Sequence, residues 1–111
     1  MEIEQREIII TIGALNLKGR LDSQSAPNLK QVWQYYETQG INNVVLNLQY
    51  VDFIDSAGIT ALVAGMKQLR ARGGDLRLVG LQPSARAVFE LMMLDKVFEI
   101  FETEEEALKG F

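Results

Sequence analysis

The sequence contains no cysteine and no histidine, and each absence excludes a kind of chemistry. Without cysteine there is no disulfide framework, no thiolate nucleophile and no cysteine metal site. Without histidine the chain lacks the commonest general base and the commonest metal ligand. The 11 Lys and Arg residues are scattered among 15 Asp and Glu, which gives a net charge of −4. This balance argues against a nucleic-acid partner, because phosphate binding needs a basic face.

Long hydrophobic runs are also absent. No apolar stretch reaches the roughly 18 residues that a membrane span needs. The N-terminal MEIEQRE is charged and lacks the apolar core of a signal peptide. We therefore expect a cytoplasmic protein with no membrane segment. The 111 residues fit one domain, residues 1–111, and 48% hydrophobic residues can supply its core.

The first 40 residues predict two strands and a helix. Apolar runs indicate strands near 6–12 and 14–20, and Gly13 between them suggests a hairpin turn. Ser25 is a good cap for the helix that follows, and Gly40 ends it.

The central stretch predicts a buried strand over 43–48, a tight connection and a helix from Ser56 to about Arg72. Asp55 can cap the first free N–H groups of this helix. Ser56 then falls in its first turn, where the hydroxyl can face solvent. Gly73 and Gly74 stop the helix.

The last third predicts a strand over 76–79, a helix opened by Pro83, a short strand over 97–101 and a final helix. Thr103 with Glu106 fits a capping box for that final helix. The apolar face of the Pro83 helix is expected to hold Ala85, Val88, Phe89 and Met92.

This order of elements predicts an α/β fold. We expect a mixed sheet of about five strands, made of an N-terminal hairpin and then parallel βα units, with about four helices. In such sheets the functional loops gather beyond the carboxyl ends of the parallel strands. Three loops qualify here, and the first two can converge: residues 22–25, 52–56 and 81–84.

Enzyme chemistry has little support in these loops. Nucleophilic catalysis by Ser56 would need a base within reach, and no histidine or recognisable serine–lysine spacing supplies one. Asp22 and Asp55 could form a carboxylate pair for acid–base work or Mg²⁺ binding. Capping of a helix and ordering of a loop explain them more simply. No glycine-rich phosphate loop is present, so we expect no enzyme, no cofactor and no metal.

Spacing alone leaves two interpretations of Ser56 open. The serine either helps only to start a helix, or is the functional centre of an exposed turn. The simpler interpretation also covers Ser25 and Ser84, each beside a proline at a helix start.

Three short motifs resemble those of a known family, and this resemblance favours the functional interpretation of Ser56. They are GRLD at 19–22, IDSAGI at 54–59 and RGG at 72–74. In this order and spacing they resemble the STAS domain, and within it the bacterial anti-sigma-factor antagonists. The resemblance covers nearly the whole chain.

The resemblance implies regulation by partner switching. The unmodified antagonist binds an anti-sigma factor that is also a serine kinase, and so frees the sigma factor. The kinase phosphorylates the serine of the Asp-Ser-x-Gly motif, which corresponds to Ser56. The modified antagonist is released until a serine phosphatase restores it.

The resemblance also implies a partner-binding surface around Ser56. Ala57 stands where relatives often carry a second hydroxyl, and Thr60 stands where many carry glycine. The implied surface comprises Asp22, Ser23, Asp55, Ser56, Ala57, Gly58, Ile59 and Thr60.

Two alternatives remain beside this hypothesis. The chain could be a STAS module with another client, either a signalling scaffold or a subunit that docks on a transporter ATPase. It could also bind a nucleotide, although the missing phosphate loop counts against this. We expect a monomer, although an edge strand of the first hairpin could pair with a second copy.

Overall fold

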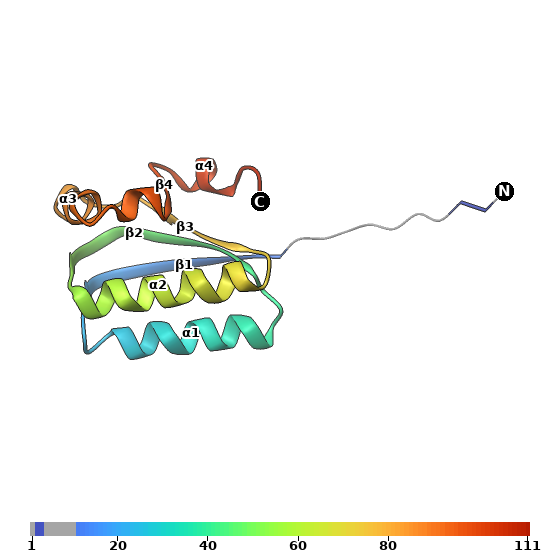
Figure 1. Cartoon of the computed structure of the whole chain (residues 1–111), viewed down its shortest axis with the longest axis horizontal. Helices are drawn as coiled ribbons and strands as arrows, with labels where there is room; N and C mark the ends of the chain where they lie inside the picture. Colours follow the sequence, from blue (N-terminus) through green and yellow to red (C-terminus); the bar gives the residue numbers. More distant parts are fainter. Residues whose placement is uncertain (1, 4–10) are drawn as a thin grey trace.

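Four strands form one sheet in the computed structural model, which describes residues 2–3 and 11–111 (Figure 1). The elements, in chain order, are β1 (Ile12–Leu21), α1 (Ala26–Thr38), β2 (Asn43–Ile54), α2 (Ser56–Ala71), β3 (Asp75–Val79), α3 (Pro83–Leu91), a 3₁₀ turn η1 (Leu94–Lys96), β4 (Glu99–Phe101) and α4 (Glu104–Leu108). The strand order is β1-β2-β3-β4, and each neighbouring pair is parallel. The predicted α/β class, the parallel βα units and the four helices are confirmed.

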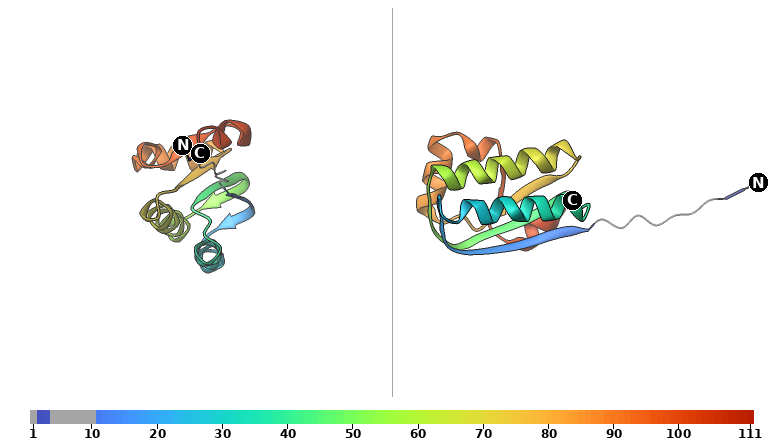
Figure 2. Two further views of the ribbon diagram at one scale, coloured as in Figure 1. Left: turned by 90° about the vertical axis from the view of Figure 1, so that its right-hand side faces the viewer. Right: turned by 90° about the horizontal axis from the view of Figure 1, so that it is seen from below.

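The helices cover the two faces of this sheet unequally. Helices α1 and α2 lie side by side on one face, and the short α4 lies on the other (Figure 2). The larger core lies between the sheet and the α1–α2 layer. A smaller apolar cluster around Val45, Val79 and Ala107 lies under α4. The carboxyl ends of β1 and β2 therefore stay free of α4 and lead directly into α1 and α2.

The predicted hairpin turn at Gly13 is wrong. Gly13 lies within β1 and pairs with Val44 of β2. A Cβ at this position would come 2.9 Å from Cζ of Tyr36, so the glycine makes room for an aromatic ring of α1 and does not reverse the chain. The strand expected near 6–12 lies mostly outside the described residues. In the described part the sheet has four strands, all parallel, and no antiparallel pair.

Strand β2 is longer than the predicted 43–48, because it continues to Ile54. Its second half pairs with β1 alone, up to the pair Leu21 and Ile54. Register shifts after Asn16 and after Gly19 let the two strands stay paired although β2 carries extra residues. Polar and aromatic residues without strict alternation hide this extension from a sequence analysis.

The longer β2 shortens the loop that was expected over 52–56. Only Asp55 separates β2 from α2. Strand β3 ends at Val79, which pairs with Asn47 in the middle of β2. The ends of β1 and β2 therefore project beyond the rest of the sheet as a two-stranded ribbon.

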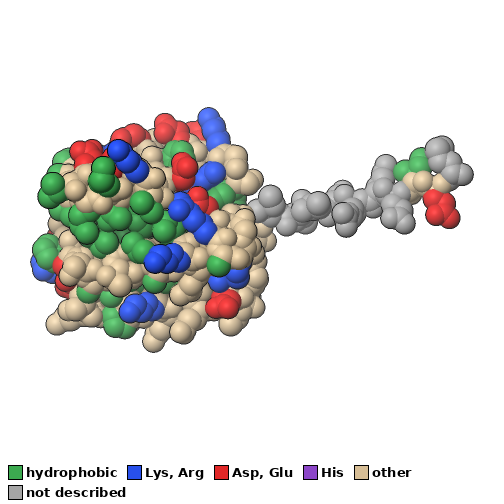
Figure 3. All heavy atoms as spheres, in the orientation of Figure 1, with side chains coloured by type: hydrophobic (Ala, Val, Ile, Leu, Met, Phe, Trp, Pro, Cys, Tyr) green, Lys and Arg blue, Asp and Glu red, His purple; other side chains and the backbone are tan. Residues whose placement is uncertain are grey.

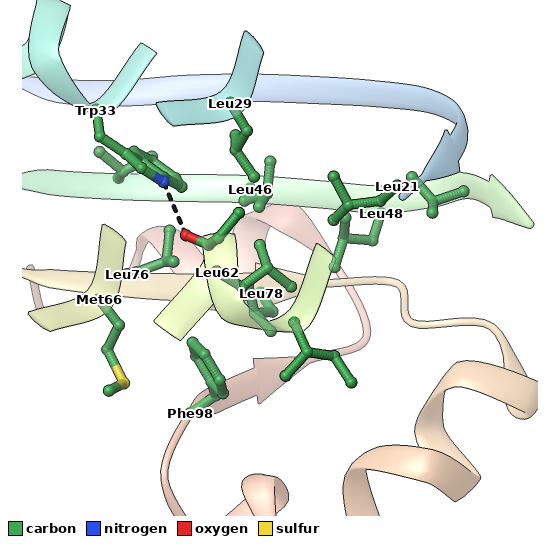
Figure 4. Packing of buried hydrophobic residues seen from close by; sticks show 14 of the residues in the cluster. Leu21, Leu29, Trp33, Leu46, Leu48, Leu62, Met66, Leu76, Leu78 and Phe98 are labelled. Atoms are coloured by element: carbon green, nitrogen blue, oxygen red, sulfur yellow. Dashed lines mark hydrogen bonds between the residues drawn. The ribbon is translucent and has the colours of Figure 1, made fainter. Parts of the chain in front are cut away.

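Trp33 of α1 is the largest fully buried side chain of the described residues and is 1% exposed (Figure 4). Its indole N–H donates to the carbonyl oxygen of Ala61 in α2 at 3.0 Å. A Cβ on Gly65 would lie 2.3 Å from Cε2 of the same ring, so α2 can approach the indole only because this position is glycine. The other buried residues of the cluster that Figure 4 labels are Leu21, Leu29, Leu46, Leu48, Leu62, Met66, Leu76, Leu78 and Phe98.

Helix α3 is less buried than the sequence predicted. Phe89 is fully buried against Phe98, but Val88 is 39% and Met92 is 53% exposed, and Ala85 is half-buried. The helix is only nine residues long and anchors through Phe89, so most of its apolar residues lack a covering element. Hydrophobic side chains accordingly gather on the face between α2 and the segment from α3 to β4 (Figure 3).

Helix α4 is held by its cap and by one arginine. Thr103 accepts a hydrogen bond from the N–H of Glu106 at 3.2 Å, which confirms the predicted N-terminal cap. Arg77 of β3 donates to the carbonyl oxygen of Ala107 at 2.9 Å and stacks on Phe111, with 3.8 Å to the ring centroid. These contacts close the second face of the sheet at the end remote from the ribbon.

Candidate functional site

Ser56 is the first residue of α2 and is exposed. Asp55 before it has an extended backbone, and its Oδ1 accepts a hydrogen bond from the N–H of Gly58 at 2.9 Å. The predicted cap is therefore confirmed. Within the described part of the chain, the Ser56 hydroxyl makes no hydrogen bond. The cap thus orders the turn and leaves this hydroxyl available to solvent.

Gly58 explains why the turn needs a glycine two residues after the serine. A Cβ at this position would lie 2.4 Å from the carbonyl oxygen of Leu21, which is backbone and cannot swing away. The same carbonyl accepts a hydrogen bond from the N–H of Asp55 at 3.2 Å. The end of β1 and the first turn of α2 are therefore in direct contact beneath Ser56.

Gly58→Ala is expected to destabilise the fold and to displace this turn. Overpacking against a rigid neighbour costs about 1–3 kcal/mol, of which roughly 1 kcal/mol is offset by the better helix propensity of alanine. Urea unfolding would measure the loss, with Thr60→Ala on the exposed side of the same turn as a control expected to stay within about 0.5 kcal/mol. Equal stability of Gly58→Ala and wild type would show that α2 can move away from β1.

Asp22 orders the turn between β1 and α1. Its Oδ1 accepts hydrogen bonds from the N–H groups of Gln24 at 3.0 Å and Ser25 at 3.2 Å, and its Oδ2 lies 3.4 Å from Nε of Arg20. Ser25 precedes the first helical residue, but its hydroxyl does not cap the helix as predicted. That hydroxyl accepts from the N–H of Asp22 and donates to the carbonyl oxygen of Arg20, so it strengthens the turn.

These hydrogen bonds make the turn sensitive to acid. Burial alone would raise the pKa of Asp22, but the N–H groups of Gln24 and Ser25, and then the side chains of Arg20 and Ser25, outweigh it and lower the pKa below its ordinary 3.8. A lowered pKa in the folded state stabilises the fold above the ordinary value, and this stabilisation is lost as the pH falls through the folded value.

Asp22→Asn is therefore expected to lose less stability than wild type as the pH falls below 3.8, the ordinary pKa of the carboxyl. Urea midpoints at several pH values, measured on both proteins, would test this. Parallel pH profiles for the two proteins would contradict it and would leave Asp22 without an ionised role in the turn.

The structure brings the predicted site residues to one edge of the sheet. Leu21 and Ile54 are paired, so the residues that follow them, Asp22 and Asp55, emerge side by side. Ser23, Ser56 and Thr60 are exposed, and Asp22, Asp55 and Ala57 are half-buried. Gly58 and Ile59 are buried, so they support the surface from beneath and offer no side chain to a partner.

Thr60 lies one turn after Ser56 on α2. Its hydroxyl donates to the carbonyl oxygen of Ser56 at 2.8 Å, so it is engaged within the helix although it is exposed.

The third predicted loop, 81–84, also reaches this edge. Nε2 of Gln82 donates to the carbonyl oxygen of Gln49 at 3.0 Å and ties the start of α3 to the projecting part of β2. A recess of about 170 Å³ lies between the two elements, and we call it the β2–α3 recess. It is lined by Asp52, Phe53, Ile54, Ser84, Ala85 and Val88. Sequence analysis named the loops 52–56 and 81–84 among the functional loops, but it did not predict that they meet in a recess. The two sides of the recess are about 30 positions apart, and no local pattern joins them.

The described residues lack two features, a cluster of metal ligands and a membrane-spanning helix. They contain no group of three or more Asp, Glu, His or Cys side chains placed to hold a metal ion. No helix among them combines the length and apolar character needed to cross a membrane.

The parallel sheet and the helices beside it define a small α/β module that carries an exposed serine hydroxyl at the carboxyl edge of the sheet, in the first turn of α2. The family model of the STAS domain matches residues 2–107, and the chain belongs to this family. The resemblance inferred from the three motifs is thereby confirmed.

Several relatives carry a functional name. The candidate anti-sigma factor antagonist BtrV of Bordetella bronchiseptica is 34% identical over 95 residues, which cover 86% of this chain and 82% of BtrV. The anti-sigma-B factor antagonist of Listeria monocytogenes is 31% identical over 88 residues, which cover 79% of this chain and 77% of that protein.

Solved structures agree with this grouping. The anti-sigma factor antagonist SpoIIAA in its unphosphorylated form matches with a TM-score of 0.76 at 25% identity, covering 91% of this chain and 90% of that chain. The phosphorylated form of SpoIIAA, a Bacillus cell fate determinant, matches with a TM-score of 0.69 at 26% identity, covering 91% and 93%.

Proposed function

We propose that this chain is an anti-sigma factor antagonist controlled by phosphorylation of Ser56. In its unmodified form it binds an anti-sigma factor that is also a serine kinase, and so frees a sigma factor. Transfer of a phosphoryl group to the Ser56 hydroxyl releases the partner. A serine phosphatase restores the unmodified form. The chain itself is a substrate and a ligand, not an enzyme.

One observation carries the proposal: the Ser56 hydroxyl is exposed on a turn that is otherwise tightly ordered. Asp55 caps the turn, and Gly58 seats it against the backbone of β1. A kinase needs an accessible hydroxyl, and a docking protein needs a surface that does not move. The names of the relatives, and the two phosphorylation states in which SpoIIAA is known, support the same role.

The electrostatics of the turn support a switch that acts at the surface. Phosphorylation adds about −1.5 to −2 charges at pH 7. The N-terminus of a 16-residue helix tolerates this charge, because its free N–H groups and dipole favour an anion. The carboxylates of Asp22 and Asp55 lie at the same edge of the sheet, and Arg20 pairs with the first of them. The fold is therefore expected to persist while the potential felt by a docked protein changes sharply.

Affinity capture tests the proposal directly. The unmodified protein, immobilised and exposed to a lysate of its own organism, is expected to retain an anti-sigma factor with an ATP-binding kinase domain. Addition of ATP should release that protein and leave phosphate on Ser56, as read by mass spectrometry. Thr60→Ala should still be phosphorylated and Ser56→Ala should not. Phosphate on another residue, or capture that ATP does not reverse, would rule the mechanism out.

A further inference from the structure

The β2–α3 recess lies immediately beside the proposed docking turn. Three of its residues, Asp52, Phe53 and Ile54, lead directly into Asp55 and Ser56. Its other wall comes from the start of α3. A volume of about 170 Å³ is far above the ~10–15 Å³ that one water requires, so the recess has room for part of a side chain.

The walls of the recess combine apolar surface with one carboxylate. Phe53 is 40% and Val88 is 39% exposed, so both present apolar surface to solvent. Asp52 is exposed and forms no ion pair with any residue of the described part of the chain. No lysine or arginine lines the recess, and Ser84 adds a hydroxyl at the rim.

A cationic side chain with an apolar stem complements such a surface. Its methylene groups would cover Ile54 and Val88 while its charge meets the carboxylate of Asp52. Arginine fits better than lysine, because its planar guanidinium is more weakly hydrated, stacks on aromatic rings and pairs with a carboxylate. Cζ of Arg20 lies 4.0 Å from the centroid of the Phe53 ring, so this ring already stacks one guanidinium, and the incoming one depends mainly on the carboxylate of Asp52.

We propose that the β2–α3 recess receives an arginine side chain of the protein that docks over Ser56. The inference rests on the proposed function, because it assigns the recess to the same partner. The recess complements a cationic side chain in charge and is continuous with the Ser56 turn. Asp52 then helps to determine which partner binds, whereas the phosphorylation state of Ser56 determines when it binds.

A fragment titration tests the recess without the partner. N-acetyl-arginine amide, added to the isotope-labelled full chain, is expected to shift the backbone NMR signals of Phe53, Ile54, Ser84 and Val88. N-acetyl-norleucine amide, which keeps the stem and lacks the charge, should bind more weakly. Asp52→Asn should weaken the arginine probe about fivefold, the upper range for an exposed ion pair. Equal shifts from both probes would assign the recess to an apolar group and overturn the inference. If these signals shift with protein concentration and not with either probe, the recess is occupied by a second copy of the chain. That outcome would also overturn the inference.

Binding of the captured partner to variants of this chain is the second test. Asp52→Asn is expected to lower affinity for it about fivefold and to reduce the dependence on salt, because an exposed ion pair is lost. Glu90→Gln removes a carboxylate on α3 that does not line the recess, and should bind as wild type does. If ATP and Ser56 control capture but Asp52→Asn binds like wild type, the recess inference fails alone. If the capture of the partner does not depend on the phosphorylation state of Ser56, the proposed function fails. The fragment titration still decides whether the recess binds a guanidinium.

Discussion

Trp33→Ala is expected to lower the free energy of unfolding by about 3–5 kcal/mol, the range for removing a buried aromatic side chain. The indole is almost fully buried and is the only tryptophan in the chain. Its removal leaves a cavity between α1 and α2, because Gly65 has no side chain to fill the space. It also removes the hydrogen bond to Ala61 that joins the two helices. For a chain of this length the whole stability is about 5–15 kcal/mol, so the variant should be close to unfolding at 37 °C.

Urea unfolding followed by circular dichroism measures this loss. At a slope of ~2 kcal/mol per molar, the midpoint should fall by roughly 2 M. Tyr35→Ala is the matched control, because Tyr35 is an aromatic residue of the same helix that is 58% exposed. Its substitution should change stability by about 0.5 kcal/mol or less. Similar losses for the two variants would mean that the contact between α1 and α2 does not organise the core.

The elements that sequence analysis located correctly are those whose signals are local. Asp55 and Thr103 mark helix starts, because a capping side chain bonds to an N–H only three residues away. Gly73, which ends α2, adopts a left-handed backbone that favours glycine. Each of these signals acts within one turn, so the tertiary structure did not have to be known.

The predictions that were wrong or incomplete concern residues whose conformation or burial depends on other elements of the fold. Gly13 suggested a turn, but it lies within β1 and makes room for the ring of Tyr36, which belongs to the helix α1 packed on the sheet. The second half of β2 has no strand pattern of its own, and β1 holds it in place through two register shifts. The face of α3 was expected to be buried, but only Phe89 is fully buried, while Ala85 is half-buried and Val88 and Met92 are exposed. In the first two cases the deciding contact joins residues more than 20 positions apart along the chain. In the third, burial depends on whether another element of the fold covers the helix, which no local pattern reveals.

The candidate site shows the same division. The serine, its cap and the glycine that seats the turn lie within four consecutive residues, 55–58, and were found together. The contact of Gly58 with Leu21 gives that short motif its physical reason, and only the fold reveals it. The β2–α3 recess joins two segments that have no shared motif. It therefore depends on the length of β2 and on where α3 begins.

Ser56→Asp is expected to weaken binding of the anti-sigma factor about 100-fold. Two unit charges ~6 Å apart interact by roughly 3 kcal/mol at an effective dielectric of 20, which corresponds to this factor if the partner places a carboxylate over the serine. The stability of the variant should stay within about 1 kcal/mol of wild type, because an acidic residue in the first turn suits the helix dipole. Ser56→Ala should bind like the unmodified wild type and stay bound when ATP is added.

The control must separate a local effect from a change in net charge. Gln68→Glu adds the same charge to an exposed position of the same helix, 12 residues further on and thus ~18 Å away. Beyond the Debye length of about 8 Å at physiological salt, this charge is largely screened from the Ser56 turn, so the variant should bind within about twofold of wild type. Calorimetric titration of the captured partner would give the four affinities. Equal affinity for wild type, Ser56→Ala and Ser56→Asp would remove the switch. Equal weakening by Ser56→Asp and Gln68→Glu would reduce it to a general charge effect, because only a docked surface close to the hydroxyl can distinguish the two positions.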